Sequence, residues 1–347
     1  MKILYGVQGT GNGHITRSRI LIPLLRSMGH DVEVLISGRK KDKYFDMEAF
    51  EPYQIKHGLT FITAKGKVKI VKTAMNLNII KFIKDIRGQD ISNIDLIISD
   101  YEPITAWIAK MKKIVSMGIA HQYAFAYKIP IAGDDFFSRK LLKFFAPVDI
   151  GVGIHWYNFG QPLLPPIIPN FSKESLSSTI EGKVLVYLPF EDLNEIIDFL
   201  KPYKQYGFYI YHDIKHQRTF KNFYLRPFSA IGFKNDLISS TKVICNAGFE
   251  LPSEALLLGK NLLVKPLIGQ MEQVSNAEAI RQLKIGSVMN TLDNNILKDW
   301  LVEPRSKSIN YPNSAYDLAK WIDGRKWEKI DTLSEKLWEK VDLSSFV

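Results

Sequence analysis

The sequence predicts an α/β protein made of two domains, each a parallel sheet covered by helices. Short apolar runs alternate with amphipathic helical patterns along most of the 347 residues, as in parallel sheets joined by crossover helices. A glycine-rich loop, residues 8–18, joins the first apolar run to the first helical pattern. Residues 160–169 hold four prolines and predict an extended connector, which suits two domains of about 150 residues each.

Strands and helices alternate through the first half of the chain. The expected strands cover residues 3–7, 32–37, 94–99, 113–117 and 150–154. The expected helices cover residues 16–28, 104–110 and 138–145. Residues 65–87 carry six lysines among apolar residues and predict a strand or loop followed by a helix.

The second half repeats the alternation. Its expected strands cover residues 183–188, 208–211, 223–226, 243–245, 262–265 and 286–288. Its expected helices cover residues 193–200, 233–239, 254–258 and 273–282, and residues 314–341 are largely helical. The predicted division is a first domain over 1–165, a second over 166–315, and a helical tail over 316–347 that packs back on the first domain.

Composition places the chain among ordinary globular proteins. Hydrophobic residues make up 46% and charged residues 24%. A single cysteine, Cys245, excludes an internal disulfide framework and suits a reducing compartment. We find no secretory signal and no run of about 20 apolar residues, so we expect a cytoplasmic protein.

Positive charge is concentrated in the first half. Residues 1–170 carry 23 Lys and Arg against 14 Asp and Glu, whereas residues 171–347 carry 23 against 22. This excess is compatible with an anionic membrane surface, a phosphorylated or acidic substrate, or a solvated basic surface without a partner. Nucleic acid is disfavoured because no recognised binding motif accompanies the charge. The basic stretch 65–87 fits a helix lying on a membrane or an ordinary surface helix packed on the core.

The first loop, Gly9-Thr-Gly-Asn-Gly-His14, argues against a dinucleotide site. Its glycine spacing is G-x-G-x-G-H, whereas the dinucleotide fingerprint is G-x-G-x-x-G. The strand after it ends at Ser37-Gly38-Arg39, where a ribose-binding acidic residue would be needed. An NAD-dependent oxidoreductase is therefore disfavoured.

A second informative stretch begins at the expected strand 243–245. The small-residue turn from Asn246 to Gly248 leads into a helix with Pro252 and Glu254 in its first turns. Backbone N–H groups at such a helix start favour a phosphate. From this strand on, the chain runs in the order strand, Asn-Ala-Gly turn, Ser-Glu-Ala helix, strand, Pro, Glu-Gln and Asn-Ala. This order resembles the donor half of GT-B glycosyltransferases of families 1 and 28.

The resemblance extends to the UDP-glycosyltransferases and to the bacterial N-acetylglucosaminyltransferases that complete the lipid-linked peptidoglycan precursor. It implies two Rossmann-like domains facing across a cleft, with the first loop matching the family's N-terminal G-G-x-G-H loop. It also implies donor-binding residues: Glu254 on the ribose, Glu272 and Gln273 on the donor sugar, Arg226 and Phe228 at the uracil pocket, and Asn246, Ala247, Gly248 and Phe249 around the diphosphate.

One loop departs from the family pattern. Residues 188–192 are Leu-Pro-Phe-Glu-Asp, where the peptidoglycan enzymes have a glycine-rich loop. Glu191 and Asp192 are expected to repel a diphosphate, which leaves part of that binding mode and the identity of the base open.

The resemblance also implies a catalytic dyad. His14 ends the first loop and Asp100 follows the strand 94–99, so both lie at one edge of a parallel sheet. An imidazole suits deprotonation of an acceptor hydroxyl, and a carboxylate beside it fixes its tautomer. Glu102 is the substitute partner if Asp100 is structural. In the alternative, His14 only shapes the loop or binds a substrate phosphate. Whichever role His14 has, the residues expected on the acceptor side are Gly9, Gly11, Asn12, Gly13 and His121.

The expected activity is inverting, metal-independent transfer of a sugar from a UDP-sugar to a hydroxyl. The histidines show no H-E-x-x-H spacing, so we expect no metal site and no cofactor beyond the nucleotide-sugar substrate. The acceptor is expected to be a glycan, lipid or small molecule, with a lipid-linked or cell-envelope glycan at the inner face of the membrane favoured by the basic first half. The alternatives are a nucleotide-sugar 2-epimerase of the same fold and a non-catalytic nucleotide-sugar- or polysaccharide-binding protein.

Overall fold

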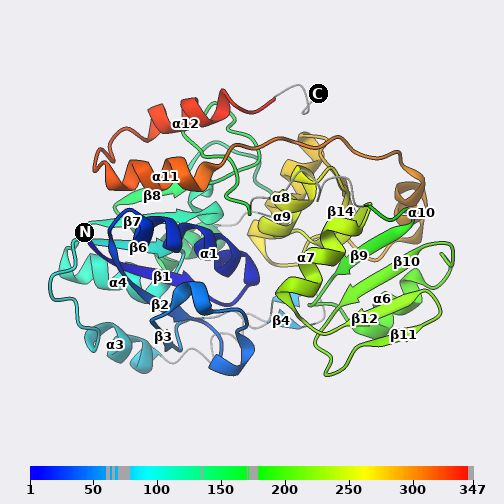
Figure 1. Cartoon of the computed structure of the whole chain (residues 1–347), viewed down its shortest axis with the longest axis horizontal. Helices are drawn as coiled ribbons and strands as arrows, with labels where there is room; N and C mark the ends of the chain where they lie inside the picture. The colour runs from blue at the N-terminus through cyan, green and yellow to red at the C-terminus, as the bar shows by residue number, and fades with distance from the viewer. Residues whose placement is uncertain are drawn as a thin grey trace.

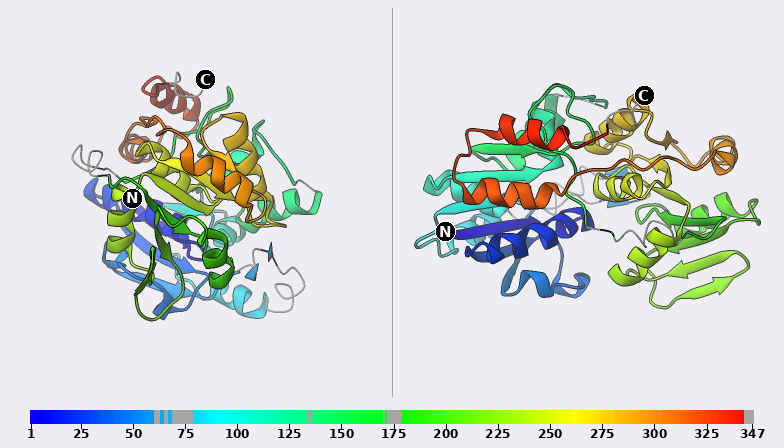
Figure 2. Two further views of the ribbon diagram at one scale, coloured as in Figure 1. Left: turned by 90° about the vertical axis from the view of Figure 1, so that its right-hand side faces the viewer. Right: turned by 45° about the horizontal axis from the view of Figure 1, so that its top comes forward.

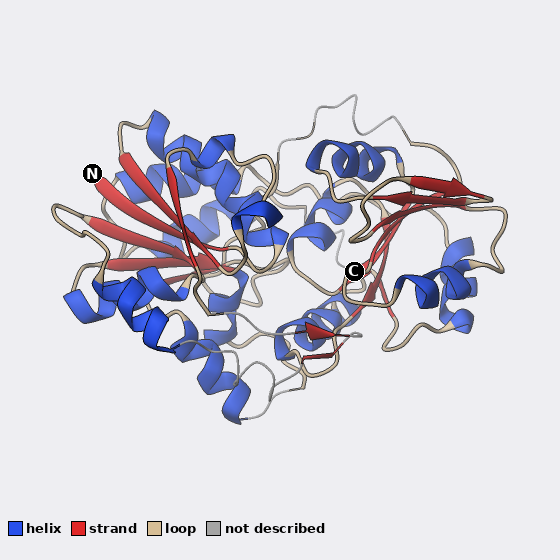
Figure 3. Cartoon of the chain, turned by 90° about the horizontal axis from the view of Figure 1, so that it is seen from below, coloured by secondary structure: helices blue, strands red, loops and turns tan. Residues whose placement is uncertain are grey.

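A computed structural model shows two large sheets that lie side by side, each with helices on both faces (Figure 1, Figure 3). The predicted α/β class is confirmed. Below, each sheet with its helices is called the first or the second domain. The structure describes residues 1–59, 63–64, 67–68, 79–133, 136–169, 171 and 179–342.

The sheet of the first domain is parallel throughout, in the order β3-β2-β1-β6-β7-β8. Its strands are β1 (Lys2–Gln8), β2 (Asp31–Ser37), β3 (Tyr53–Lys56), β6 (Leu96–Asp100), β7 (Ser116–Ala120) and β8 (Ile150–Gly153). Every residue of β6 and β7 is buried, because helices cover both faces of the sheet. The strand order reverses between β1 and β6, so the carboxyl ends of these two strands border the crevice where such sheets bind ligands.

The helices of the first domain are α1 (Asn12–Ser27), α3 (Ile79–Arg87), α4 (Pro103–Lys112) and α5 (Phe136–Phe145), with 3₁₀ turns η1 (Lys41–Lys43), η2 (Glu48–Phe50) and η3 (His121–Ala126). β7 begins three residues later than expected, because α4 runs to Lys112 and Lys113 takes a left-handed backbone conformation with φ of 58°. Edge strand β3 is not predicted from sequence. Of the basic stretch 65–87, residues 65–66 and 69–78 lie outside the described residues; β4 (Thr63–Ala64) pairs with β5 (Lys67–Val68).

The sheet of the second domain has the order β11-β12-β10-β9-β13-β14-β15, parallel except for the hairpin β11–β12. Its strands are β9 (Lys183–Tyr187), β10 (Gly207–Tyr211), β11 (Arg218–Phe220), β12 (Phe223–Arg226), β13 (Lys242–Asn246), β14 (Asn261–Lys265) and β15 (Ser287–Val288). The strand order reverses between β9 and β13. The turn after β13 therefore lies at the ligand-binding edge of this sheet.

The helices of the second domain are α6 (Leu193–Leu200), α7 (Ala230–Ser239), α8 (Glu250–Leu257), α9 (Met271–Gln282) and α10 (Asn294–Val302). α8 begins four residues earlier than expected, with Pro252 in its first turn, where a missing N–H costs nothing. Figure 1 shows α8 next to α1, so the starts of helices from both domains meet at the domain boundary.

The helical tail returns to the first domain. It consists of α11 (Ser314–Asp323) and α12 (Ile330–Trp338), which lie along the first sheet (Figure 2). α11 packs on α1. Ser334 Oγ and Trp338 Nε1 both donate to the carbonyl of Leu163 at 2.7 Å, which fixes α12 to the proline-rich segment.

Candidate active site

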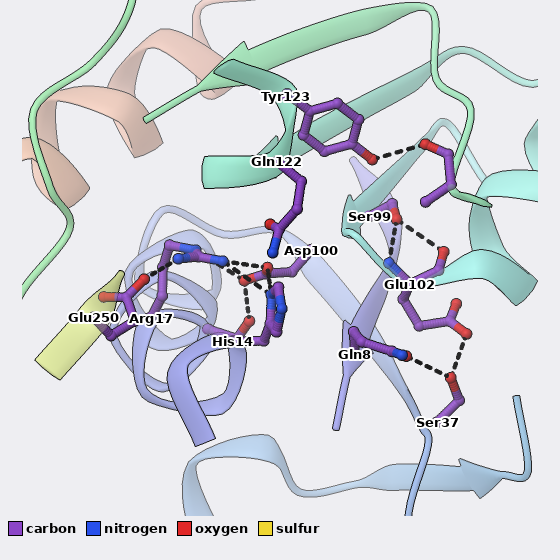
Figure 4. A network of polar contacts seen from close by, with 12 residues as sticks. Gln8, His14, Arg17, Ser37, Ser99, Asp100, Glu102, Gln122, Tyr123 and Glu250 are labelled. Atoms are coloured by element: carbon purple, nitrogen blue, oxygen red, sulfur yellow. Dashed lines mark hydrogen bonds and ion pairs between the residues drawn. The ribbon is translucent and has the colours of Figure 1, made fainter. Parts of the chain in front are cut away.

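His14 and Asp100 meet at the reversal point of the first sheet. His14 lies in the first turn of α1, and Asp100 is the last residue of β6. The ring Nδ1 of His14 is 2.7 Å from Oδ1 of Asp100 (Figure 4). A carboxylate only accepts, so Nδ1 carries the hydrogen, and in the neutral ring Nε2 then has the lone pair. The His14 side chain is 15% exposed and Asp100 is fully buried, so the ring is the part of the pair that a substrate can reach.

Asp100 is held by three side chains of α1. Besides His14, Ser18 Oγ donates to Oδ2 at 2.9 Å, and Arg17 donates through Nε to Oδ2 at 3.1 Å and through Nη2 to Oδ1 at 2.5 Å. Burial opposes ionisation of Asp100, but the Arg17 guanidinium and the His14 ring hold its pKa below the usual value. The carboxylate is therefore charged and fixed in orientation.

Arg17 and Glu250 are site residues that sequence reasoning did not identify. Arg17 is 2% exposed, and its Nη1 donates to Oε1 of Glu250, the first residue of α8 in the second domain (Figure 4). Burial raises the pKa of Glu250, while the Arg17 guanidinium opposes that rise. One signal in the sequence is the spacing of Arg17 three residues after His14, which puts both side chains on one face of α1.

Gly13 allows this contact between the domains. A Cβ built on Gly13 would lie 2.8 Å from Cγ of Glu250, closer than side-chain carbons approach. Gly9 is restricted on the other side, because a Cβ there would lie 2.2 Å from the hydroxyl of Tyr44. Gly11 differs from both: a Cβ there would meet nothing within 4 Å, and α1 begins after it without a side-chain cap. The amides at the start of α1 are thus left for a ligand or water.

Asn12 links the loop to both domains. Its Nδ2 donates to the hydroxyl of Tyr187 on β9 at 3.2 Å, and its Oδ1 accepts from Arg39 Nη2 at 2.9 Å.

Glu102 caps α4. Its Oε1 accepts from the amide of Ile104 at 2.9 Å and from Ser37 Oγ at 2.6 Å, and its Oε2 accepts from the amide and hydroxyl of Thr105 at 2.7 and 2.8 Å. Burial raises its pKa, and these hydrogen bonds oppose the rise. Both oxygens are occupied away from His14, so the geometry favours Asp100 as the partner of the ring.

The polar groups at the turn after β13 have fewer hydrogen-bond partners than those around Asp100. Asn246 Nδ2 donates to the carbonyl of Lys265 at 3.0 Å, but its buried Oδ1 has no partner among the described residues. A Cβ on Gly248 would meet nothing within 4 Å. Ala247 is fully buried and can offer only backbone to a ligand. Phe249 is 6% exposed and stacks on His121, with ring centroids 4.3 Å apart.

Glu254 lies one turn into α8 and is partly buried. Burial raises its pKa to about 7, and Lys234 opposes the rise. In the described part of the chain its carboxylate accepts no hydrogen bond. Such a group can gain stability from ligand hydroxyls that donate to it.

Arg226 is the last residue of β12 and Phe228 follows that strand, at the same edge of the second sheet. Arg226 donates from Nη1 to Gln217 Oε1 at 2.8 Å, and its guanidinium lies 5.7 Å from the ring centroid of Tyr209. Phe228 is 37% exposed and meets Tyr187 edge-on at 6.1 Å. The exposed Phe228 ring is available for stacking on a flat base.

Glu272 and His121 lie in the contact between the domains, and Gln273 is next to Glu272 in α9. Glu272 Oε2 accepts from Gln122 Nε2 at 2.9 Å, and Gln273 Oε1 accepts from the amide of Leu267 at 3.0 Å. His121 Nε2 is 2.6 Å from Oδ1 of Asn276 on α9, and burial lowers its pKa. Glu272 and His121 thus join η3 to α9, with His121 among buried aromatic rings, whereas Gln273 bonds within the second domain.

The two acidic residues after β9, Glu191 and Asp192, each have a partner within the second domain. Glu191 Oε1 accepts from Lys265 Nζ at 2.7 Å, with both side chains 6% exposed. Asp192 caps α6 by accepting from the amides of Asn194 and Glu195. Glu191 is therefore paired with a cation and Asp192 is used by a helix, which weakens the expected repulsion of a diphosphate.

Two further observations concern the described residues only. They contain no group of three or more His, Cys, Asp or Glu side chains that could hold a metal ion. None of their helices has the length and apolarity to cross a membrane.

Solved structures share this architecture at low sequence identity. Arabidopsis thaliana UGT89C1 complexed with UDP is 13% identical, with 97% of this chain and 99% of that chain covered and a TM-score of 0.58. The glycosyltransferase SsfS6 of Streptomyces sp. SF2575, complexed with thymidine diphosphate, is 12% identical, with 100% of this chain and 96% of that chain covered and a TM-score of 0.57. Acinetobacter baumannii MurG is 12% identical, with 93% and 99% covered and a TM-score of 0.54. A search of curated proteins found no match.

The fold that these structures share is that of the GT-B glycosyltransferases, as the sequence predicts. A family model described as glycosyl transferase family 1 matches residues 1–303. The chain belongs to this family and is a glycosyltransferase.

Proposed function

We propose that this enzyme transfers a sugar from a UDP-sugar to a hydroxyl acceptor with inversion. In this reaction Nε2 of His14 takes the proton of the acceptor hydroxyl as its oxygen attacks the anomeric carbon. The bond from that carbon to the diphosphate breaks, and the nucleoside diphosphate leaves. The observation that supports this most is the 2.7 Å contact of His14 with a buried, charged Asp100, which leaves Nε2 as an accessible base.

The donor is proposed to bind at the turn after β13. Glu254 accepts from the ribose hydroxyls, Phe228 stacks on the base, and the open backbone at Gly248 leaves room for the diphosphate next to the start of α8. The helix-start amides there suit an anion. Asn246 supports the same placement, because its buried Oδ1 lacks a partner among the described residues. Ala247 and Phe249 shape the turn, and Arg226 borders the base.

Glu272 and Gln273 are proposed to reach the donor sugar from the start of α9. In the structure Glu272 accepts from Gln122 of the first domain. A sugar hydroxyl can replace that donor, which would leave the carboxylate satisfied in both states. On the acceptor side, the proposal places Gly9, Gly11, Asn12 and Gly13 around the attacking hydroxyl. His121 supports the domain contact behind them.

A panel of nucleotide sugars tests the donor proposal. Thermal stabilisation by UDP-sugars, with little by sugars of other nucleotides, is the expected result. If only thymidine diphosphate sugars stabilise the protein, the donor is a thymidine diphosphate sugar and not a UDP-sugar. If no nucleotide sugar stabilises it, the proposed donor site is contradicted. Product analysis on the stabilising sugar then separates the alternatives: a transferred sugar with inverted configuration supports the proposal, a 2-epimer indicates an epimerase, and an unchanged ligand indicates a binding protein.

We propose that no divalent cation or other cofactor takes part. The charge that develops on the departing diphosphate would be stabilised by the amides at the start of α8. Turnover that is unchanged in EDTA is expected. Loss of turnover in EDTA that Mg²⁺ restores would contradict this part of the proposal.

We propose a peripheral contact with an anionic membrane through α3, which would suit a lipid-linked or cell-envelope acceptor at the cytoplasmic face. Ile86 of α3 packs in the first domain, but Ile79, Ile80 and Ile83 are 59%, 84% and 40% exposed. Lys84 and Arg87 lie on the same helix. Sedimentation with phosphatidylserine vesicles should fall when both cations are replaced by Glu. Unchanged sedimentation would remove the support.

A further inference from the structure

The contact between η3 and α9 includes one polar pair whose hydrogen bonds are incomplete. Gln122 follows β7 in the first domain, and its Nε2 donates to Glu272 Oε2 of α9 at 2.9 Å. A carboxylate only accepts, so the amide nitrogen faces Glu272 and the amide oxygen points elsewhere. That oxygen, Oε1 of Gln122, is buried and has no hydrogen-bond partner among the described residues. The accepting half of this amide is therefore unused.

Two other polar contacts between the domains are complete. Ser275 Oγ accepts from the amide of Ala132 and donates to the carbonyl of the same residue, both at 3.1 Å. Ser253 Oγ accepts from Trp156 Nε1 at 2.8 Å and donates to a carbonyl of its own domain at 2.7 Å. Buried polar groups in native proteins usually have their partners. The unpartnered oxygen of Gln122 is thus an exception in this interface, and it points to a donor that a ligand would supply.

Gln122 lies beside the proposed catalytic pair. β6 and β7 are neighbours in the first sheet, so Asp100 at the end of β6 and Gln122 just after β7 share one edge. Figure 4 shows the carboxamide of Gln122 directed toward His14 and Asp100. Glu272, its partner across the domain contact, is only partly buried, so a ligand can reach the pair from that side. The amide therefore lies between the proposed base and a residue proposed for the donor sugar.

On the basis of the proposed function, we propose that Gln122 recognises two adjacent hydroxyls of the donor sugar. One hydroxyl enters the hydrogen bond between Gln122 and Glu272: its oxygen accepts from Nε2, and its hydrogen is donated to the carboxylate. The adjacent hydroxyl donates to Oε1. Both polar atoms of the amide then have a partner, and Glu272 keeps one. The first domain thereby contributes a specificity-determining residue to the sugar site.

This arrangement selects donor sugars by their hydroxyls. A site that hydrogen-bonds a substrate hydroxyl rejects an analogue that lacks it, because buried polar groups are then left unpaired. A sugar without the first hydroxyl separates Gln122 from Glu272 and does not replace their bond. A sugar without the second leaves Oε1 unpartnered, as in the free protein. The substrate class is therefore a nucleotide sugar with two adjacent free hydroxyls, and deoxy sugars that lack either one are poor ligands.

The test is calorimetric binding of UDP-glucose and of its analogues that lack one hydroxyl, at carbon 2, 3, 4 or 6. In the wild type, removal of either of two adjacent hydroxyls should weaken binding by about 10- to 100-fold. In Gln122→Met, which keeps the side-chain length without the amide, these losses should shrink by about fivefold or more. UDP has no sugar and should bind both proteins equally. Gln54→Met, at an exposed glutamine of β3, is the matched control and should keep the wild-type losses.

Equal losses in the wild type and in Gln122→Met would overturn the inference. A wild type that binds all four deoxy analogues as tightly as UDP-glucose would overturn it as well. Circular dichroism checks the fold, and if Gln122→Met is unfolded, Gln122→Ala is measured in the same way with the same expected result. Failure of the wild type to bind UDP would instead contradict the proposed donor site. Binding of UDP with unchanged losses would leave that site standing and remove only the role of Gln122.

Discussion

The loop after β1 and the turn after β13 both border a reversal of strand order, but their polar groups are used in opposite ways. In the first, Asp100 accepts four hydrogen bonds, and Arg17 donates to both of its carboxylate partners. In the second, Asn246 Oδ1 has no hydrogen-bond partner among the described residues, and the Glu254 carboxylate accepts no hydrogen bond from them, although Lys234 interacts with it electrostatically. Groups that do chemistry need fixed geometry before the substrate arrives, whereas groups that bind gain most when a ligand completes their hydrogen bonds. The contrast suggests that the first region is built for catalysis and the second for recognition.

The largest effect on turnover is expected from Asp100→Asn, which removes the negative charge of Asp100 from the first of these two regions. An amide carries no negative charge to stabilise the protonated ring, and its NH2 group can donate to Nδ1 and favour the wrong tautomer. Turnover should therefore fall by about 10² to 10⁴-fold. The measurement is the initial rate at saturating donor, with circular dichroism as the check on folding. A folded variant within a few-fold of the wild-type rate would break the comparison.

The next largest effect is expected on nucleoside binding by Glu254, near the turn after β13. Because the pKa of Glu254 is about 7 in the free protein and ribose hydroxyls would favour its ionised form, binding should release a proton. Affinity for uridine, which has no phosphate to titrate, should therefore rise about tenfold from pH 6 to pH 8. Glu254→Gln should bind about 10- to 100-fold more weakly, with no pH dependence.

Calorimetry in buffers of different ionisation enthalpy measures both the affinity and the proton release. The raised pKa should also affect the free energy of unfolding. The free wild-type protein should lose stability as the pH rises from 4.5, the ordinary pKa of a glutamate, through about 7, the pKa of Glu254 in the folded protein. Glu254→Gln should lose less stability over the same range. Uridine binding with equal pH dependence in both proteins would exclude Glu254 from the ribose site.

A smaller effect is expected where the two regions touch. Gly13→Ala puts a Cβ 2.8 Å from Glu250 Cγ and should destabilise the protein by about 1 to 3 kcal/mol. Gly11→Ala is the matched control, because a Cβ there meets nothing within 4 Å. Thermal melting of the two variants compares them directly. Equal melting temperatures would show that α1 and α8 do not meet as closely as described.

Much of the fold could be predicted because buried parallel strands leave near-continuous apolar runs in the sequence. Strands β3 and β11 could not: β3 is a short edge strand, and all three residues of β11 are exposed. His14, Asp100 and Glu254 could be proposed because each follows a strand or opens a helix. The contact of Arg17 with Glu250 could not, since it spans 233 positions and depends on how two domains meet. A glutamate at a helix start is equally well explained by the helix dipole.

The division of labour between the two regions is tested most directly by His14→Ala, with nucleotide affinity and turnover measured on the same preparation. The dissociation constant for UDP should stay within about twofold of the wild-type value, because the proposed donor contacts lie in the second domain. Transfer to the acceptor should fall by about 10²-fold or more. Wild-type transfer by the variant would contradict the account, and so would a loss of UDP binding that matched the loss of turnover.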